Sequence, residues 1–367
     1  MMDEKALTGI VVSICNDILL NNKENDLPIL DLEGWEKLFR LASEQGLLPI
    51  ITQGLERLEP EDKRIQRVLS KSCGNALKNR RSYLHRISLM REMSRWFGEE
   101  GIDIMFIKGA SLSQLYPVPE HRVFSDIDFY LFGNFQKGIS VMEQHGIKNS
   151  PFYHHHTQAS IQGVLLENHY DFVERVNHKC DVLIDDSLKN LASKEGRSLR
   201  AWFLGEEVRN AYLMTPTMNA IFLMRHMSAH FTGETISLRM LYDWSLFVKK
   251  QGQEVDWDYV KNLYLDSGMM RFAGIVKGLM SRYFNYDSAY FPVVSGKKDD
   301  IEKVWDSIFT PPPKDPYKKY TLRYYLFETK IFFANRWKHE IVYPGETYLV
   351  LFFRYVNLAI RMIIRRR

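Results

Sequence analysis

Apolar side chains recur every third or fourth residue through the N-terminal part of the chain, which is the spacing of helices that bury one face. Trp35, Leu38 and Leu41 follow this spacing. A longer run with the same spacing ends at Gly101, and glycine is a common stop signal for a helix. The pattern predicts a helical region over residues 1–100.

The pattern changes beyond this helical region. Ile102–Ile107 is a short apolar run typical of a buried strand, and a glycine turn with a short helix follows it. Apolar and polar residues alternate over Asp126–Phe132, which predicts a second strand, and Ile161–Tyr170 predicts a third. A helical run separates the last two. We therefore expect a small α/β unit over residues 101–200.

Helical spacing returns at about Thr215 and continues to about Phe309. It predicts a C-terminal helical domain over residues 201–310. A run of three prolines, 311–313, then breaks the pattern, and the remaining extension, 311–367, is rich in basic and aromatic residues.

Composition narrows the classes of protein that fit. The chain is 45% hydrophobic and 26% charged, as globular proteins usually are. A formal net charge of +4 is small for 367 residues and does not indicate a nucleic-acid binder. The cysteines, Cys15, Cys73 and Cys180, show no paired spacing for disulfides or zinc. The N-terminus lacks the basic and cleavage regions of a secretory signal, so we expect a cytoplasmic protein.

The C-terminal segment 349–367 leaves a second location open. It is strongly apolar, but Arg354, Asn357 and Arg361 interrupt the run, so it is a poor membrane-spanning candidate. On a helix, its basic residues would face lipid headgroups and its apolar residues the membrane interface, giving a peripheral membrane contact. The alternative is a terminal helix that packs on the protein's own core. The basic and aromatic stretch before it suits either an anionic partner or an amphipathic helix on the core.

The strand over Asp126–Phe132 carries the most informative chemistry. Side chains two residues apart on a strand point to the same face, so Asp126 and Asp128 emerge side by side. Adjacent carboxylates repel each other and favour a bound cation, and oxygen ligands suit Mg²⁺ or Mn²⁺. Upstream, Gly109 allows backbone N–H groups to approach a triphosphate closely, and the helix that starts near Ala110 presents its positive end.

Several motifs together resemble one known family. The Lys108-Gly109 turn, the LYP spacer and the R-x-x-S-D-I-D strand are similar to the poorly characterised nucleotidyltransferase family of the polymerase-beta-like superfamily. The segments GLLPIITQGL, LLENHYDF, and H-x-x-x-H followed by LR-x-x-x-D-W extend the resemblance over about Trp35 to Phe247. The superfamily's turn has Gly followed by Gly or Ser, whereas this chain has Gly109-Ala110-Ser111.

The resemblance implies an α+β fold, with a small mixed-sheet nucleotidyltransferase core flanked by N-terminal and C-terminal helical segments. It also implies transfer of a nucleoside monophosphate from a triphosphate, with ATP expected, to a hydroxyl acceptor, with release of pyrophosphate. A third carboxylate of the superfamily maps onto Glu167, with Asp181 as the competing candidate. The expected metal-binding and catalytic residues are Asp126, Asp128 and Glu167, with Mg²⁺ (or Mn²⁺), and the expected nucleotide-binding residues are Lys108, Gly109, Ala110, Ser111 and Arg122.

Each of these assignments has an alternative. Lys108 fits a solvated charge and Arg122 a structural ion pair as well as a phosphate contact. The acceptor stays open between a protein, an RNA end, a sugar and a small molecule. Two other functions remain: a catalytically silent nucleotide-binding module, which the altered turn suggests, and a D-x-D glycosyltransferase, which the basic C-terminal segment suggests.

The histidines suggest a separate metal-binding site. Three consecutive residues on a strand do not all point to one ion, so we interpret His154–His156 as a loop or strand edge. His226 and His230 share a helical face, and we expect them to make structural contacts, with Asp243 or Arg239 as candidate partners. The family resemblance, which places this helix after the catalytic unit, leaves open that they line the nucleotide cleft. The neighbouring Trp244 is expected in the core.

Overall fold

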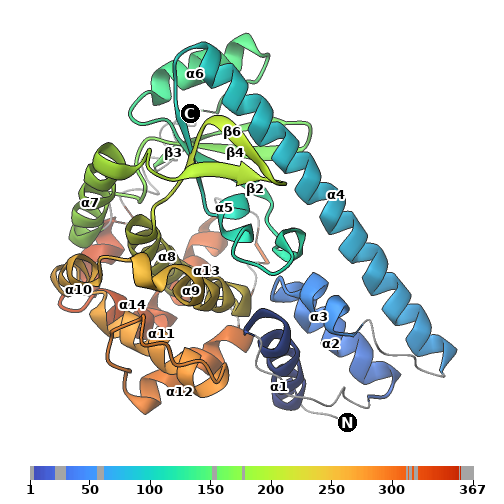
Figure 1. Cartoon of the computed structure of the whole chain (residues 1–367). Helices are drawn as coiled ribbons and strands as arrows, with labels where there is room; N and C mark the ends of the chain where they lie inside the picture. Colours follow the sequence, from blue (N-terminus) through green and yellow to red (C-terminus); the bar gives the residue numbers. More distant parts are fainter. Residues whose placement is uncertain are drawn as a thin grey trace.

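The computed structural model describes most of the 367-residue chain. The described residues are 4–20, 30–55, 62–150, 155–175, 178–310, 313, 316, 317, 321–354 and 356. Figure 1 shows a β-sheet at one end of the molecule, a long helix along one side, and a group of helices below the sheet.

A mixed six-stranded sheet confirms the expected α+β fold class. Its spatial order is β3-β4-β2-β1-β6-β5, in which β2–β4 and β1–β6 are parallel pairs and the other neighbours are antiparallel. The strands are β1 (Ile104–Ile107), β2 (Asp126–Tyr130), β3 (His156–Ile161), β4 (Val164–His169), β5 (Arg200–Phe203) and β6 (Glu206–Leu213).

The strand predicted over Ile161–Tyr170 is confirmed for Val164–His169, but its start is wrong, because the segment begins with a tight turn. Gln162 and Gly163 both have positive φ, at 50° and 79°, and they join β3 to β4. Two consecutive residues with positive φ form the hairpin turns whose twist matches that of the flanking strands. The glycine within an apolar run was the signal of this turn, and β3 begins upstream at His156.

The sheet extends beyond the predicted α/β unit of 101–200. β6 pairs in parallel with β1, so the sheet ends at Leu213 rather than before residue 200. The sequence interpretation overlooked this strand and its partner β5. The division of the chain into the domains 1–100, 101–200, 201–310 and 311–367 stays a prediction.

The other regular elements of the described chain are helices, in line with the predicted helical segments on both sides of the sheet. On the N-terminal side and within the core region they are α1 (Glu4–Cys15), the π-helical turn η1 (Asn16–Leu20), α2 (Leu32–Glu44), α3 (Leu48–Gly54), α4 (Lys63–Glu99), α5 (Gly109–Ser113), η2 (Pro119–His121), α6 (Phe135–Gln144) and α7 (Lys179–Glu195). After the sheet come α8 (Pro216–Gly233), α9 (Leu238–Gln251), η3 (Gly252–Glu254), α10 (Trp257–Asp266), α11 (Met270–Tyr283), α12 (Lys298–Phe309), α13 (Leu322–Ala334) and α14 (Arg336–Val342).

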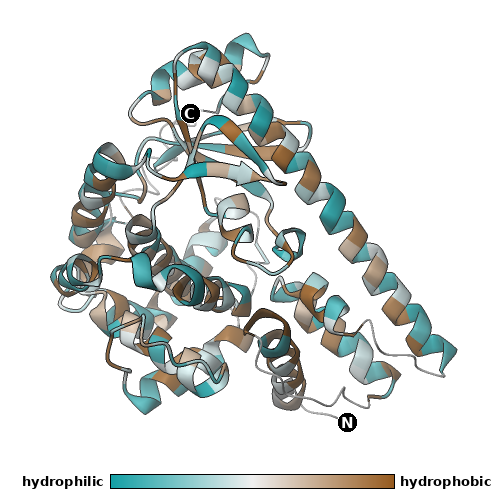
Figure 2. Ribbon diagram, in the orientation of Figure 1, coloured by the Kyte–Doolittle hydropathy of each residue, from teal (hydrophilic) through white to brown (hydrophobic). Residues whose placement is uncertain are grey.

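One face of the sheet is apolar and is covered by the long helix α4. The side chain of Asp62 caps the N-terminus of α4 by accepting from the Arg64 N–H, and the helix runs along the side of the molecule to the sheet (Figure 1). Its last turns bury Met93 and Phe97 in the same cluster as Ile127 and Phe129 of β2. In Figure 2, hydrophilic and hydrophobic residues alternate along α4, as expected of a helix with one covered face.

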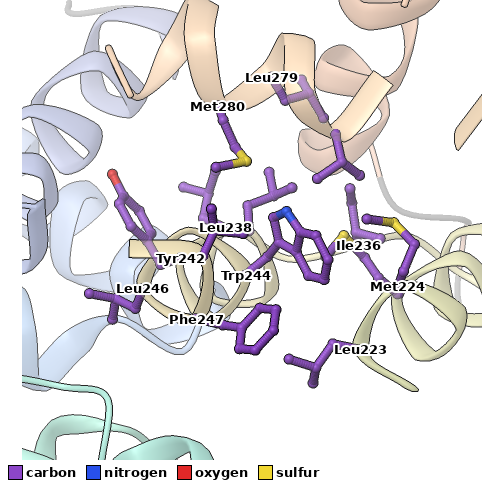
Figure 3. Close-up of a cluster of buried hydrophobic side chains, with 14 of the residues drawn as sticks. Leu223, Met224, Ile236, Leu238, Tyr242, Trp244, Leu246, Phe247, Leu279 and Met280 are labelled. Carbon is purple, nitrogen blue, oxygen red and sulfur yellow. The ribbon is translucent and has the colours of Figure 1, made fainter. Parts of the chain in front are cut away.

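A second core lies among the helices below the sheet. Figure 3 shows its part around α9, where Tyr242, Trp244 and Phe247 meet Leu279 and Met280 from α11. Trp244 has no exposed surface, which confirms its expected core role. The Tyr242 hydroxyl also donates to Asn16 Oδ1 at 2.8 Å, so N-terminal and C-terminal helices share this core.

The C-terminal part differs from the helices before it. None of the described side chains of α13 is buried, so α13 does not cover the core as an amphipathic helix would. Most of the predicted interfacial segment 349–367 lies outside the described residues, which include only 349–354 and 356. No helix in the described part of the chain combines the length and apolar character that crossing a membrane requires.

Candidate active site

The second face of the sheet carries the acidic side chains. On β2, Ile127 and Phe129 point into the core beside α4, so Asp126 and Asp128 point the other way. β4 runs parallel to β2 with Asp128 directly opposite Glu167. The three predicted carboxylates therefore share one face of two neighbouring strands.

Asp128 lies at the centre of this face and is almost completely buried, with 2% exposure. Its Oδ1 is 2.8 Å from Lys108 Nζ and 3.0 Å from His169 Nε2. Burial alone would raise the pKa of Asp128, but the Lys108 ammonium and His169 outweigh burial and hold the pKa well below its ordinary value. Asp128 is therefore ionised at neutral pH.

Glu167 stands beside this pair in a different electrostatic state. Its Oε1 accepts a hydrogen bond from Gln158 Nε2 at 3.1 Å, and its Oε2 lies 3.9 Å from His169 Nε2. Burial, and then the negative charge of Asp128, raise the pKa of the Glu167 carboxyl. A carboxylate with a raised pKa is a better proton acceptor near neutral pH.

Asp126 completes the set in a more open position. It is half-buried, and among the described residues no hydrogen bond or ion pair involves its carboxylate. Burial lowers the pKa of the Lys108 ammonium, but the charges of Asp128, Asp126 and Glu167 outweigh burial and raise it. All three carboxylates thus act on a single lysine.

The backbone conformation of Lys108 is unusual. Its φ is 51°, a value that costs free energy for any residue except glycine and that is most often retained at functional sites. Gly109 follows with φ 27°, and a Cβ atom there would lie 3.1 Å from Phe124 Cδ2. Glycine is therefore required, and the turn directs the Lys108 side chain toward Asp128.

Ala110 and Ser111 begin the short helix α5, but their side chains are already engaged. Ala110 packs in the apolar cluster of the sheet. The Ser111 hydroxyl donates to the Lys108 carbonyl. Any contact of these residues with a phosphate would therefore come first from backbone N–H groups, which have no partner within the first turn of a helix.

Arg122 is held in a buried ion pair with α9. Its Nε donates to Asp243 Oδ1 at 2.7 Å and its second terminal nitrogen to Oδ2 at 2.8 Å. A third hydrogen bond of 2.9 Å reaches the Gly109 carbonyl, and the Tyr116 hydroxyl donates to Asp243 at 2.8 Å. This arrangement favours the structural role for Arg122, because it joins the glycine turn to α9.

A pocket of about 500 Å³ opens next to Lys108, between α2, α8 and α9. Its lining contains the basic side chains Lys108, Arg122 and Arg239 and the acidic side chains Glu44, Glu234 and Asp243, together with His226 and His230. Because Asp243 neutralises Arg122, the other positive charges of the lining come from Lys108 and Arg239. The sequence interpretation named Arg239 only as a candidate partner of the two histidines, and the structure places it in the lining of this pocket.

The contacts of the two α8 histidines differ from the expected ones. His226 stacks on Phe222, with ring centroids 5.8 Å apart, and the rings of His226 and His230 are 4.6 Å apart. Asp243, one of their expected partners, binds Arg122 instead. Burial, and then the charge of Lys108, lower the pKa of His226, so its imidazole is neutral at physiological pH.

Asp181, the competing candidate for the third carboxylate, is bound elsewhere. It lies in α7 and forms a two-pronged ion pair with Arg225 of α8, at 2.5 and 2.9 Å. The group whose ligand atoms lie within 4.8 Å of one another contains Asp128, Glu167 and His169. His169 is a residue that the sequence interpretation did not assign, although it follows Glu167 by two positions and so shares its face of the strand.

The donor set on this face fits a divalent cation. Two carboxylates and an imidazole converge, Asp126 lies on the same side of β2, and carboxylate oxygens are the usual protein ligands of Mg²⁺ and Mn²⁺. His169 Nδ1 lies 3.2 Å from the Asp171 carbonyl. Such a backbone hydrogen bond is the usual support of a metal-ligating histidine, because it orients the ring and leaves Nε2 to face the ion.

A comparison with known families agrees with this geometry. Residues 31–285 match the family described as "Uncharacterised nucleotidyltransferase", and this match covers more than half of the chain. This match identifies the class of the protein as nucleotidyltransferase, as the sequence motifs predicted. The chain belongs to this uncharacterised nucleotidyltransferase family. No curated protein and no solved structure matches the chain.

Proposed function

We propose that the protein transfers a nucleoside monophosphate from a nucleoside triphosphate, with ATP as the expected donor, to a hydroxyl group of an acceptor in a reaction that needs Mg²⁺ or Mn²⁺. The single observation that carries this proposal is the convergence of Asp126, Asp128 and Glu167 around Lys108, at the end of a glycine turn. Three carboxylates and one ammonium leave an excess of negative charge that a divalent cation would neutralise.

The metal-binding residues in this proposal are Asp126, Asp128 and Glu167. A divalent cation held there would neutralise charge on the phosphates and lower the barrier to displacement at phosphorus. Asp128 is suited to this role because it stays ionised at neutral pH. Asp126 is suited to it because its carboxylate has no other partner among the described residues.

The triphosphate would occupy the pocket of about 500 Å³ beside Lys108. Lys108 and Arg239 supply positive charge for the phosphate oxygens, and the Gly109 turn brings the backbone close to them. Arg122 acts indirectly, since its hydrogen bond to the Gly109 carbonyl and its ion pair with Asp243 hold the turn in place.

The chemical step is a displacement at the α-phosphorus. A bond forms between the acceptor oxygen and the α-phosphorus, and the bond from that phosphorus to the oxygen bridging to the β-phosphate breaks. The electron pair of the broken bond leaves with pyrophosphate. The acceptor's hydroxyl proton passes to Glu167, whose raised pKa makes it a better proton acceptor than Asp128, whose pKa is lowered.

The proposal is tested by following label from α-labelled nucleoside triphosphates, with Mg²⁺ or Mn²⁺ and a cell extract as the source of acceptors. We expect label transfer and pyrophosphate release by the wild type, and loss of both in Asp128→Asn. Asp258→Asn is the matched control, because Asp258 is 91% exposed on α10. Melting curves of both variants show whether they are folded.

Two other outcomes separate the rival functions. Tight triphosphate binding without transfer to any acceptor would overturn the proposal in favour of a catalytically silent binding module. The engaged side chains of Ala110 and Ser111 are the observation that supports that candidate. Hydrolysis of a sugar nucleotide in place of label transfer would indicate a glycosyltransferase.

A further inference from the structure

A cluster of three histidines lies on the same face of the sheet as the carboxylates. His155 lies in the turn before β3, His156 is the first residue of β3, and His169 is the last residue of β4. His156 and His169 are direct neighbours in the β3–β4 register. The hairpin therefore brings His155 and His156, which the sequence interpretation placed in a loop or strand edge, next to His169 at the end of the predicted strand.

The three imidazole rings converge on one point. Their centroids are 4.6 Å apart for His155–His156 and 5.2 Å apart for each of the two pairs with His169. One nitrogen from each ring lies within 4.8 Å of the other two. Consecutive residues within a strand point to opposite faces, but His155 and His156 are not both within the strand. His155 precedes the first residue of β3.

Three converging imidazoles form a donor set with a definite metal preference. Nitrogen ligands suit Zn²⁺, Co²⁺, Cu²⁺ and Ni²⁺, whereas Mg²⁺ prefers oxygen. Three histidines with an open fourth position are a common arrangement for zinc. The Nδ1 of His169 is next to the Asp171 carbonyl, which leaves its Nε2 on the side of the cluster.

The surroundings also favour a bound cation. The Glu167 carboxylate lies 3.5 Å from His156 Nε2 and 3.9 Å from His169 Nε2, so it offers negative charge next to two of the rings. His156 and His169 are buried and His155 is half-buried. A second pocket, of about 220 Å³, is lined by His155, His169 and Lys108, and it provides a route to the cluster.

We propose that His155, His156 and His169 bind one divalent transition-metal ion, such as Zn²⁺, beside the carboxylates of the candidate active site. This site requires only the three imidazole nitrogens and is independent of nucleotidyl transfer. The protein would then have neighbouring positions with different metal preferences: an oxygen-rich one at Asp126 and Asp128 and a nitrogen-rich one at the histidines, with His169 next to both.

Binding of Co²⁺ tests the site without any enzymatic reaction. The full chain, treated with EDTA and then freed of it, is titrated with Co²⁺ and followed by visible absorption. We expect one equivalent to bind to the wild type. We expect His155→Gln and His156→Gln to weaken the binding by at least about tenfold, the lower end of the cost of losing even an outer-shell partner. His85→Gln on α4 is the control, and it is expected to bind Co²⁺ like the wild type.

A spectrum of the wild type keeps the test decisive if a histidine variant does not fold. With one equivalent of Cu²⁺, the electron paramagnetic resonance spectrum is expected to show hyperfine couplings to imidazole nitrogen. A spectrum without couplings to nitrogen, or unchanged Co²⁺ affinity in both histidine variants, would overturn the site. Co²⁺ binding without label transfer supports the histidine site and counts against the proposed function. Label transfer with Mg²⁺ by a protein that binds no Co²⁺ supports the proposed function and counts against the histidine site.

Discussion

Two buried aspartates, Asp243 and Asp128, each form an ion pair with a basic side chain. The difference between their surroundings distinguishes a structural ion pair from a candidate functional one. Asp243 accepts two hydrogen bonds from Arg122 and one from Tyr116, so its charge is matched by one guanidinium. Asp128 binds Lys108 and His169, but Glu167 is its direct neighbour across the β2–β4 pair. The first centre is balanced, whereas the second has an excess of carboxylates.

This difference explains the chemistry of the two regions. A balanced, two-pronged ion pair fixes the position of the glycine turn against α9 and needs no further partner. An unbalanced group of carboxylates costs free energy unless a cation or a proton joins it. The sequence motif R-x-x-S-D-I-D thus contains residues of both centres. Arg122 belongs to the balanced centre, and Asp126 and Asp128 belong to the unbalanced centre.

The largest effect is expected from breaking the balanced centre. Asp243→Ala leaves the buried Arg122 guanidinium without its partner, and removing one member of a buried pair costs about 3–5 kcal/mol. Urea unfolding measures the loss, and Asp258→Ala at an exposed site is the control. A loss below about 1 kcal/mol would show that Arg122 is not held by Asp243 in the way described.

The next largest effect concerns the unbalanced centre and is an effect on activity. Asp126→Asn removes a charge that binds no described residue, so the free energy of unfolding should change by less than about 0.5 kcal/mol. Label transfer, in contrast, should fall by at least about 100-fold, because a metal ligand is lost. If the loss of unfolding free energy were as large as the loss of transfer expressed as a free energy, the distinction between the two centres would be removed.

Removal of the metal gives a smaller effect, limited to the unbalanced centre. Mg²⁺ with a triphosphate binds the native state, so at ten times its Kd it should stabilise the wild type by about 1.4 kcal/mol. Asp128→Asn should abolish this stabilisation, and Asp126→Asn should reduce it. Thermal melting with Mg²⁺ and with EDTA measures the difference. A full metal-dependent shift in Asp128→Asn would place the cation elsewhere.

The smallest effect depends on pH and arises at Glu167. Folding raises the pKa of this carboxyl above its ordinary value of 4.5 through burial and Asp128, so folding favours the protonated form. The stability from that form is complete below the ordinary pKa and is lost as the pH rises through the folded value. Without metal, Glu167→Gln should therefore be more stable than the wild type near pH 7.5, by about 0.5–1 kcal/mol.

The same substitution has a pH signature that tests its cause. The gain in stability of Glu167→Gln should shrink as the pH falls toward 4.5, because the wild-type carboxyl then becomes neutral as well. Chemical unfolding at several pH values in EDTA measures it. A gain that does not depend on pH would come from packing or hydrogen bonding and not from the charge.

The parts of the site that local spacing determines could be predicted from the sequence. Asp126 and Asp128 were placed together because the period of a strand is two residues, and the glycine turn was recognised from the residues around Gly109. Glu167 was found through the family resemblance and not through spacing. The register of β2 and β4, which brings it opposite Asp128, is a tertiary property.

The contacts that the sequence did not predict join distant parts of the chain. Arg122 and Asp243 are 121 positions apart, so no local pattern indicates their ion pair. His169 was not assigned although it follows Glu167 by two positions on the same face of β4. His155 and His156 were not connected with His169, since only the hairpin at Gln162 and Gly163 brings the two segments side by side.

The most direct test of the unbalanced centre is a crystal structure with Mn²⁺ and a nonhydrolysable triphosphate, in which anomalous scattering locates the metal. We expect an anomalous peak within ligand distance of the Asp126, Asp128 or Glu167 carboxylates, with the phosphates beside Lys108. No peak at these three carboxylates, with the nucleotide bound in another part of the molecule, would contradict the proposed active site.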